Sequence, residues 1–186
     1  MTAMTTEVLG LPRGRALTRD DLDSLPDDGH RYELLDGVLI VSPAPRVLHQ
    51  WAIANLFSVL NEACPADCKV LTSPLDVVLA ADTVIQPDLL VAPRHAFTER
   101  DLPVAPLVAV EVLSPSTRSI DLLLKKDRLS RAGGAHYWVV DPDEPSITAW
   151  ALRDEAYVQV GRAVGDEELA LTDPFVVSLV PSALLA

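Results

Sequence analysis

The sequence lacks several features that would place it in a well-defined class. Its two cysteines, Cys64 and Cys68, have neither a metal-site framework nor a redox spacing around them, which argues against a zinc module or a disulfide scaffold. No apolar run is long enough to cross a bilayer, and the first residues lack the apolar core of a signal peptide, so we expect a soluble, cytoplasmic protein without a membrane partner. Internal repeats, a glycine-rich phosphate loop and a nucleophile elbow are also absent.

Positive charge is scarce as well. The chain has 15 Lys and Arg residues against 27 Asp and Glu residues, a formal net charge of −12, so the chain as a whole would repel a polyanion. The segment 118–131 departs from this balance. It contains two acidic residues and five basic ones, namely Arg118, Lys125, Lys126, Arg128 and Arg131. Such a segment is compatible with a phosphodiester substrate, and equally with a solvated helix face.

The composition supports one well-formed core. The chain has 186 residues, of which 49% are hydrophobic, and this length suits one domain better than two. Residues 1–15 contain Gly10, Pro12 and Gly14 and show no periodicity, so they are predicted to form a flexible leader. The single domain is therefore expected over residues 16–186.

Apolar periodicity and turn residues predict an α/β protein, with a mixed sheet between a long helix and a second helix. A short helix should begin at Thr18, and Asp36-Gly37 should join the strands 31–35 and 38–41 in a hairpin. A long amphipathic helix is expected over residues 46–63, with a buried face of Val47, Trp51, Ala54, Leu56, Phe57 and Leu60. Further strands are expected at 69–71, 75–79, 136–140, 147–152 and 156–160, and residues 175–184 should return to the core.

Two other apolar runs each carry a carboxylate that a buried strand would not normally contain. In residues 84–91, Pro87 interrupts the β-forming residues, so Asp88 should lie at a break in a sheet. In residues 107–113, Glu111 lies on the side of a central strand opposite to three valines. An unpaired buried carboxylate costs several kcal/mol, so Glu111 must be neutral, paired with a cation or bound to a metal.

A cation for these carboxylates is available on the next predicted helix, residues 119–132, for which Ser119 is the expected N-cap. Lys125 falls within the apolar stripe of this helix, which consists of Leu122, Leu129 and Ala132. We therefore expect Lys125 to point inward. The alternative is an exposed i,i+4 pair between Asp121 and Lys125.

An Asp, a Glu on the next buried strand and a Lys resemble the catalytic constellation of the PD-(D/E)XK nuclease superfamily. Within it, the chain resembles the Uma-type family of small bacterial restriction endonuclease-like proteins. The resemblance spans nearly the whole chain and is carried by Arg31 to Gly37, His49, Gln86-Pro87-Asp88, Glu111 to Thr117, Asp121, Lys125, Gly133 and Tyr137 to Pro142. The superfamily name places a lysine two residues after the acid, where this chain has Leu113, so Lys125 is interpreted as its stand-in. Leu129 occupies a position where this family is expected to have a tyrosine.

The resemblance implies a restriction-endonuclease-like fold and a metal-dependent endonuclease acting on nucleic acid, with DNA as the expected substrate. It implies that Asp88, Glu111 and the backbone carbonyl of Val112 hold Mg²⁺ or Mn²⁺, and that Lys125 completes the catalytic set. The secondary candidates are Glu33, His49 for phosphate contact, and Asp121. Glu33 would act at the metal directly or through a neighbouring ligand; the alternative is an exposed strand residue or a partner of Arg31. Nucleases that cut both strands are commonly dimers, so a homodimer stays open.

Two other hypotheses remain at this point. One is a nuclease fold retained as a binding or interaction module without hydrolysis, which the acidic charge and the displaced lysine favour. The other places Asp88 and Glu111 at exposed strand ends, where Lys125 neutralises them structurally.

Overall fold

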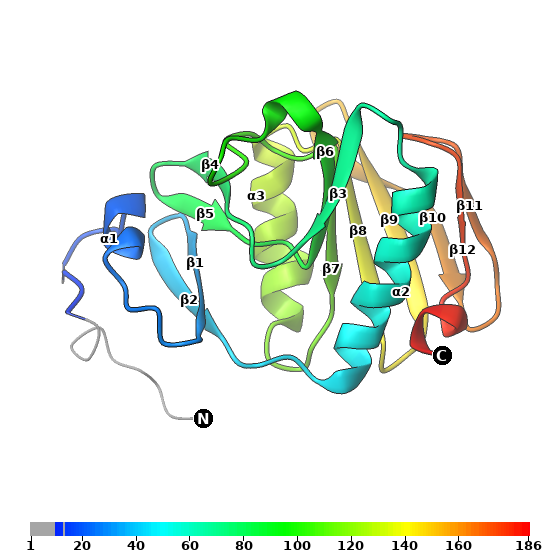
Figure 1. The fold of residues 1–186 in the computed structure, drawn as a ribbon, viewed down its shortest axis with the longest axis horizontal. Coiled ribbons are helices and arrows are strands. Elements are labelled where there is room, and N and C mark those ends of the chain that lie inside the picture. The colour runs from blue at the N-terminus through cyan, green and yellow to red at the C-terminus, as the bar shows by residue number, and fades with distance from the viewer. Residues whose placement is uncertain (1–9, 13) are drawn as a thin grey trace.

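The computed structural model describes residues 10–12 and 14–186 (Figure 1). Most of the predicted leader, residues 1–9 and 13, lies outside the described residues. Leu11 is buried with Leu17 and Leu34 in a small apolar cluster. Within the described part of the chain, no helix is long and apolar enough to span a bilayer.

The chain contains helices and strands in mixed order. The helical elements are α1 (Arg19–Asp23), α2 (Val47–Ala63), the 3₁₀ turn η1 (Arg94–Ala96), the π-helix η2 (Ile120–Lys125), α3 (Lys126–Arg131) and the 3₁₀ turn η3 (Ser182–Leu185). The first strands are β1 (Arg31–Leu35), β2 (Val38–Ser42), β3 (Cys68–Thr72), β4 (Val77–Ala80), β5 (Thr83–Ile85) and β6 (Leu89–Pro93). The later strands are β7 (Val108–Val112), β8 (His136–Asp141), β9 (Ser146–Arg153), β10 (Ala156–Val164), β11 (Leu169–Leu171) and β12 (Val177–Leu179).

The large sheet is six-stranded, in the order β10-β9-β8-β7-β6-β3. It is mixed, because β7 and β8 are parallel while β6 pairs with β7 in the antiparallel sense. Side chains alternate along β7, so Val108, Val110 and Val112 face the core cluster that contains α2, and Ala109 faces the cluster that contains Leu129 of α3. Figure 1 shows α2 and α3 on either side of β7 and β8. The predicted mixed α/β sheet between two helices is confirmed.

A second, four-stranded sheet has the order β2-β1-β5-β4. The predicted hairpin forms through Asp36-Gly37, where φ is 48° at Asp36 and 79° at Gly37, as a tight two-residue turn requires. The chain passes from β5 of this sheet to β6 of the large sheet through Gln86-Pro87-Asp88. Asp88 therefore lies at a break between two sheets, as the proline predicted.

Two local predictions are wrong, and one strand was not predicted. The buried face of α2 consists of His49, Ala52, Ile53, Leu56 and Leu60, whereas Val47, Trp51 and Ala54 are exposed. The side chain of Ser119 makes no capping hydrogen bond, and the predicted helix begins as the π-helix η2 before continuing as α3. The strand β11 was not expected, and it pairs with β12 in a small sheet over the same core.

Candidate active site

Asp88 is held at the junction of the two sheets. One of its oxygens, Oδ1, lies 2.8 Å from Nη1 of Arg31, and the other, Oδ2, accepts a hydrogen bond of 2.8 Å from the backbone N–H of Val112. Arg31 also donates to the carbonyl of Gln86 at 2.5 Å. The turn that carries Asp88 is thus fixed to β1 on one side and to β7 on the other.

Glu111 lies on β7, facing η2, and Lys125 reaches it from that π-helix. The Lys125 Nζ is 3.1 Å from Glu111 Oε1, and the side chains of Glu111 and Lys125 are 1% and 2% exposed. Asp88 is only 3% exposed. The hypothesis that the two acids lie at exposed strand ends is therefore wrong, and Lys125 points inward as the apolar stripe predicted.

Glu33, on β1, contacts the same groups. Its Oε1 lies 2.8 Å from Lys125 Nζ and accepts a hydrogen bond of 2.7 Å from the backbone N–H of Gln86. Its Oε2 lies 3.3 Å from Arg31 Nη2. Glu33 is 1% exposed, so it is not the exposed strand residue that its position in a hairpin also allowed.

Asp121 reaches the same point through the π-helix. Its Oδ1 is 3.5 Å from Lys125 Nζ, so the i,i+4 pair exists, but both residues are buried rather than solvated. The hydroxyl of Tyr137, on β8, donates a hydrogen bond of 2.7 Å to the backbone carbonyl of Asp121. Single π-helical turns inside longer helices occur frequently at functional sites.

His49 completes the group from α2. Its Nε2 lies 3.2 Å from Asp88 Oδ2, while its Nδ1 is buried and has no hydrogen-bond partner among the described residues. Because it lies in the first turns of α2, His49 is the point at which the long helix contacts the junction of the two sheets.

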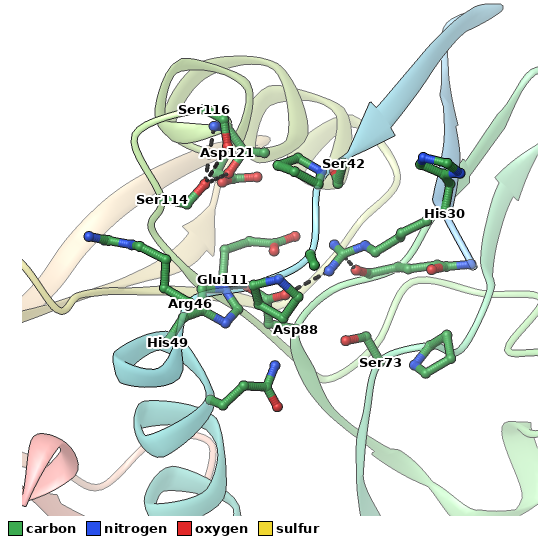
Figure 2. Close-up of a pocket in the computed structure, with 18 of the residues that line it drawn as sticks. His30, Ser42, Arg46, His49, Ser73, Asp88, Glu111, Ser114, Ser116 and Asp121 are labelled. Carbon is green, nitrogen blue, oxygen red and sulfur yellow. Dashed lines mark hydrogen bonds and ion pairs between the residues drawn. The ribbon is translucent and has the colours of Figure 1, made fainter. Parts of the chain in front are cut away.

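These side chains converge on one cavity of about 650 Å³. Asp88, Glu111, Asp121, Lys125 and His49 all line it, and Figure 2 shows Asp88, Glu111 and His49 grouped below Asp121 and Ser114. Three further basic residues, His30, Arg31 and Arg46, lie on the lining. Glu33 and Val112 do not line the cavity, although both contact residues that do.

The charges around the cavity are unbalanced. Four buried carboxyl groups, of Glu33, Asp88, Glu111 and Asp121, surround two permanent cations, Arg31 and Lys125. Two negative charges would therefore remain uncompensated if all four groups were ionised. A low-dielectric site does not tolerate such an excess without a counter-ion or a proton.

The pKa values respond to this imbalance in opposite directions. Burial and the neighbouring acids raise the pKa of Glu111 well above its ordinary value, against the opposing charge of Lys125, and burial also raises the pKa of Asp121. For Asp88, the hydrogen bond with His49 and the charge of Arg31 outweigh burial and keep the pKa below its ordinary value. Burial would lower the pKa of Lys125, but its three carboxylates outweigh it and raise the pKa. The pKa shifts of Asp88 and Lys125 therefore both favour the charged form of the side chain.

The basic segment found in the sequence is not a free cationic face. Arg118 is paired with Asp141 at 2.6 Å, and Arg128 and Arg131 are both paired with Asp36, at 2.8 and 3.0 Å. Lys126 lies over the ring of Trp150, and Lys125 is buried. Most of the positive charge of this segment is therefore compensated within the chain.

The side chains around the cavity can be matched to the ligands that a metal ion requires. Within residues 10–12 and 14–186, no three His, Cys, Asp or Glu side chains are grouped so that they could hold a metal ion by themselves. Mg²⁺ needs no such cage, since it is commonly bound by one or two carboxylates and keeps several waters. Asp88 and Glu111, which share one cavity with an excess of negative charge, fit an ion of this kind.

Two residues of the site were not singled out as candidates from the sequence. Arg31 and Gln86 both belong to the segments that carry the family resemblance. Neither is an acid within an apolar run, which is the feature that distinguishes Asp88 and Glu111 in the sequence. Their role becomes visible only when β1 and the Gln86–Asp88 turn are seen to meet.

The architecture is that of a restriction-endonuclease-like protein. A crystal structure from Anabaena variabilis ATCC 29413, described as "a putative nuclease belonging to DUF820", is similar over 91% of this chain and 97% of that chain, with a TM-score of 0.72 and 20% sequence identity. The Uma2 family model, described as "Putative restriction endonuclease", matches residues 19–182, and the chain belongs to this family. No protein with a curated description matches the chain. The family resemblance deduced from the sequence is thereby confirmed.

Proposed function

We propose that this protein is a metal-dependent endonuclease that hydrolyses phosphodiester bonds of DNA. The observation that carries the proposal is the convergence of Asp88, Glu111 and Lys125, all buried, on one cavity with excess negative charge. Such an arrangement is costly for the fold unless a cation is bound, which is the expected state of a working site rather than of a structural core.

Asp88 and Glu111 would hold Mg²⁺ or Mn²⁺, and the resemblance adds the carbonyl of Val112. When bound, the ion would polarise the scissile phosphate and lower the pKa of a coordinated water. Asp88 is suited to this task because Arg31 and the Val112 N–H orient its carboxylate, and because His49 and Arg31 keep its pKa below the ordinary value. A cation as partner would also favour the ionised form of Glu111.

Lys125 would act on the reacting groups directly. Its ammonium lies 3.1 Å from Glu111 Oε1 and can donate to the attacking water and to the charge that grows on the phosphate. Glu33 and Asp121 fix the position of that ammonium from two other directions. His30 and Arg46, on the cavity lining, would contact phosphates of the bound strand.

The test is Mg²⁺-dependent nicking of plasmid DNA by wild type and Asp88→Asn, with Glu62→Gln on the exposed side of α2 as the matched control. The expected result is that wild type and the control nick the plasmid, while Asp88→Asn is at least about 100-fold slower. Calorimetric titration with Mn²⁺ should show affinity weakened about 10- to 100-fold in Asp88→Asn. Equal nicking by Asp88→Asn and wild type would contradict the assigned role.

The competing candidate is a nuclease fold that binds nucleic acid without cutting it. The formal charge of −12 and the internal pairing of Arg118, Arg128 and Arg131 favour it. The same assay separates the two, since a binding module would retain DNA in a gel-shift experiment but leave plasmid intact with Mg²⁺ and with Mn²⁺.

A further inference from the structure

The outer strands are β10 and β3 in the six-stranded sheet and β2 and β4 in the four-stranded sheet, and β10 and β4 are protected against pairing with another chain. Strand β10 carries a bulge between Gln159 and Gly161, and β11 packs against it, with Leu169 close to Gly161. Strand β4 is bulged after Val78 and covered by the loop at Leu102. These are common devices that block an open sheet edge.

Strand β2 has none of these devices. Its sequence is Val-Leu-Ile-Val-Ser, without charge, proline or bulge, and it pairs only with β1 in the part of the chain that the structure describes. Val38 and Val41 are 65% and 36% exposed. An uncharged, apolar edge strand of this kind can pair with a strand of another molecule. We therefore expect it to be covered in the working protein.

The neighbouring surface is mostly apolar. A groove of about 530 Å³ lies between β2 and the outer side of the π-helix. Apolar residues such as Val38, Ile40, Ile120 and Leu124 line it, together with Asp36, Asp127 and Arg131. Leu123 and Leu124 of that helix are both largely exposed. Edge and groove together form one surface, which we call the β2 surface.

We propose that the β2 surface is a homodimer interface in which β2 pairs with β2 of a second copy, antiparallel, about a two-fold axis. An antiparallel edge is self-complementary, because a two-fold axis perpendicular to the sheet presents the same strand to itself. The two-residue turn makes Leu35 and Val38 the closing pair, so the backbone groups of Leu39 and Val41 point to the open side. Pairing Leu39 with Val41 of the second copy places the axis at Ile40.

The proposed interface adjoins the candidate active site. Ser42, the last residue of β2, lines the cavity, as do the residues that follow it toward α2. The π-helix separates the two features, with Asp121 and Lys125 facing the cavity and Ile120 and Leu124 facing the groove. Dimerisation would therefore place two cavities on either side of one interface. The inference concerns assembly and does not depend on nuclease activity.

The experiment is the solution mass by size-exclusion chromatography with light scattering. Wild type should show twice the 20.1 kDa of the chain, and Val38→Lys/Val41→Lys should show the single-chain mass. Val158→Lys, on the exposed part of β10, is the matched control and should remain dimeric. A monomeric wild type would overturn the proposal, as would a double variant that stays dimeric.

A second variant and a second measurement protect this test against misfolding. Val41→Pro removes an outward N–H while leaving the bonds between β1 and β2 in place, so it should also give the single-chain mass. In wild type, amide hydrogen exchange in β2 should slow as protein concentration is raised, while exchange in β10 stays constant. Exchange in β2 that does not change with concentration would contradict the interface whatever the variants do.

Discussion

The buried ammonium of Lys125 offers the sharpest test of the charge arrangement. Lys125→Met keeps the length and apolar stem of the side chain but removes the charge that three carboxylates share. Its Nζ lies 2.8, 3.1 and 3.5 Å from oxygens of Glu33, Glu111 and Asp121. At an effective dielectric constant of about 20, each contact is worth about 5 kcal/mol, most of which offsets the cost of burying the charges.

The expected net loss is about 3–5 kcal/mol of unfolding free energy at pH 7, the usual cost of removing one partner of a buried ion pair. This is a large part of the stability of an ordinary domain, about 5–15 kcal/mol. Urea unfolding followed by circular dichroism measures it. Lys126→Met is the matched control, because Lys126 lies over the ring of Trp150 and its loss should cost about 1 kcal/mol.

The pH dependence gives an independent check of the same argument. Without Lys125, the pKa values of Glu111 and Asp121, already raised, should rise further, so the folded variant binds protons that the unfolded chain releases. Stability of Lys125→Met should then fall as pH rises, and its deficit relative to wild type should shrink from pH 8 to pH 5. A cost below about 1 kcal/mol, or a deficit that does not change with pH, would refute the reasoning.

Four further outcomes are expected. Because the folded pKa of Glu111 is raised, wild-type stability should fall as pH rises above the ordinary value of 4.5, and Glu111→Gln should remove part of this fall and raise the melting temperature at pH 8 by a few degrees. Mg²⁺ should raise the melting temperature of wild type more than that of Glu111→Gln, and equal shifts would speak against a metal role for this acid. Leu129→Ala should cost about 2–5 kcal/mol in urea unfolding because the side chain is fully buried, whereas Leu123→Ala at an exposed position should cost below about 1 kcal/mol. Gly37→Ala should destabilise the hairpin, since φ is +79° and the new Cβ would lie 2.5 Å from Cβ of Ala16; an unchanged melting temperature would contradict this.

The sequence was sufficient to find the strands and the acids that interrupt them. Alternation along residues 107–113 predicted that Glu111 faces away from the three valines, and Pro87 predicted a break at Asp88, since a proline cannot donate to a sheet. Both signals are local, and each rests on one strand. The structure places the two acids as these signals require.

Features that depend on contacts between distant segments could not be found in this way. The buried face of α2 was misassigned because Trp51 and Val47 are as apolar as Ile53. The face is selected by the docking of α2 on η3, β3, β12 and β7. In the π-helix, the hydroxyl of Tyr137 on the distant strand β8 holds the backbone carbonyl of Asp121. Nothing in residues 119–125 alone distinguishes it from an α-helix.

The position of Glu33 has a consequence for how this candidate site can change. Glu33 contacts Arg31 of β1, the Gln86–Asp88 turn and Lys125, so the charged groups of the site also hold the two sheets to each other. Loss of Lys125 alone would leave the buried carboxylates without their cation, and this would weaken the contact between the two sheets. Removing the lysine together with one of its carboxylates avoids this unpaired charge. The double variant Lys125→Met/Glu111→Gln should therefore lose less unfolding free energy than Lys125→Met alone.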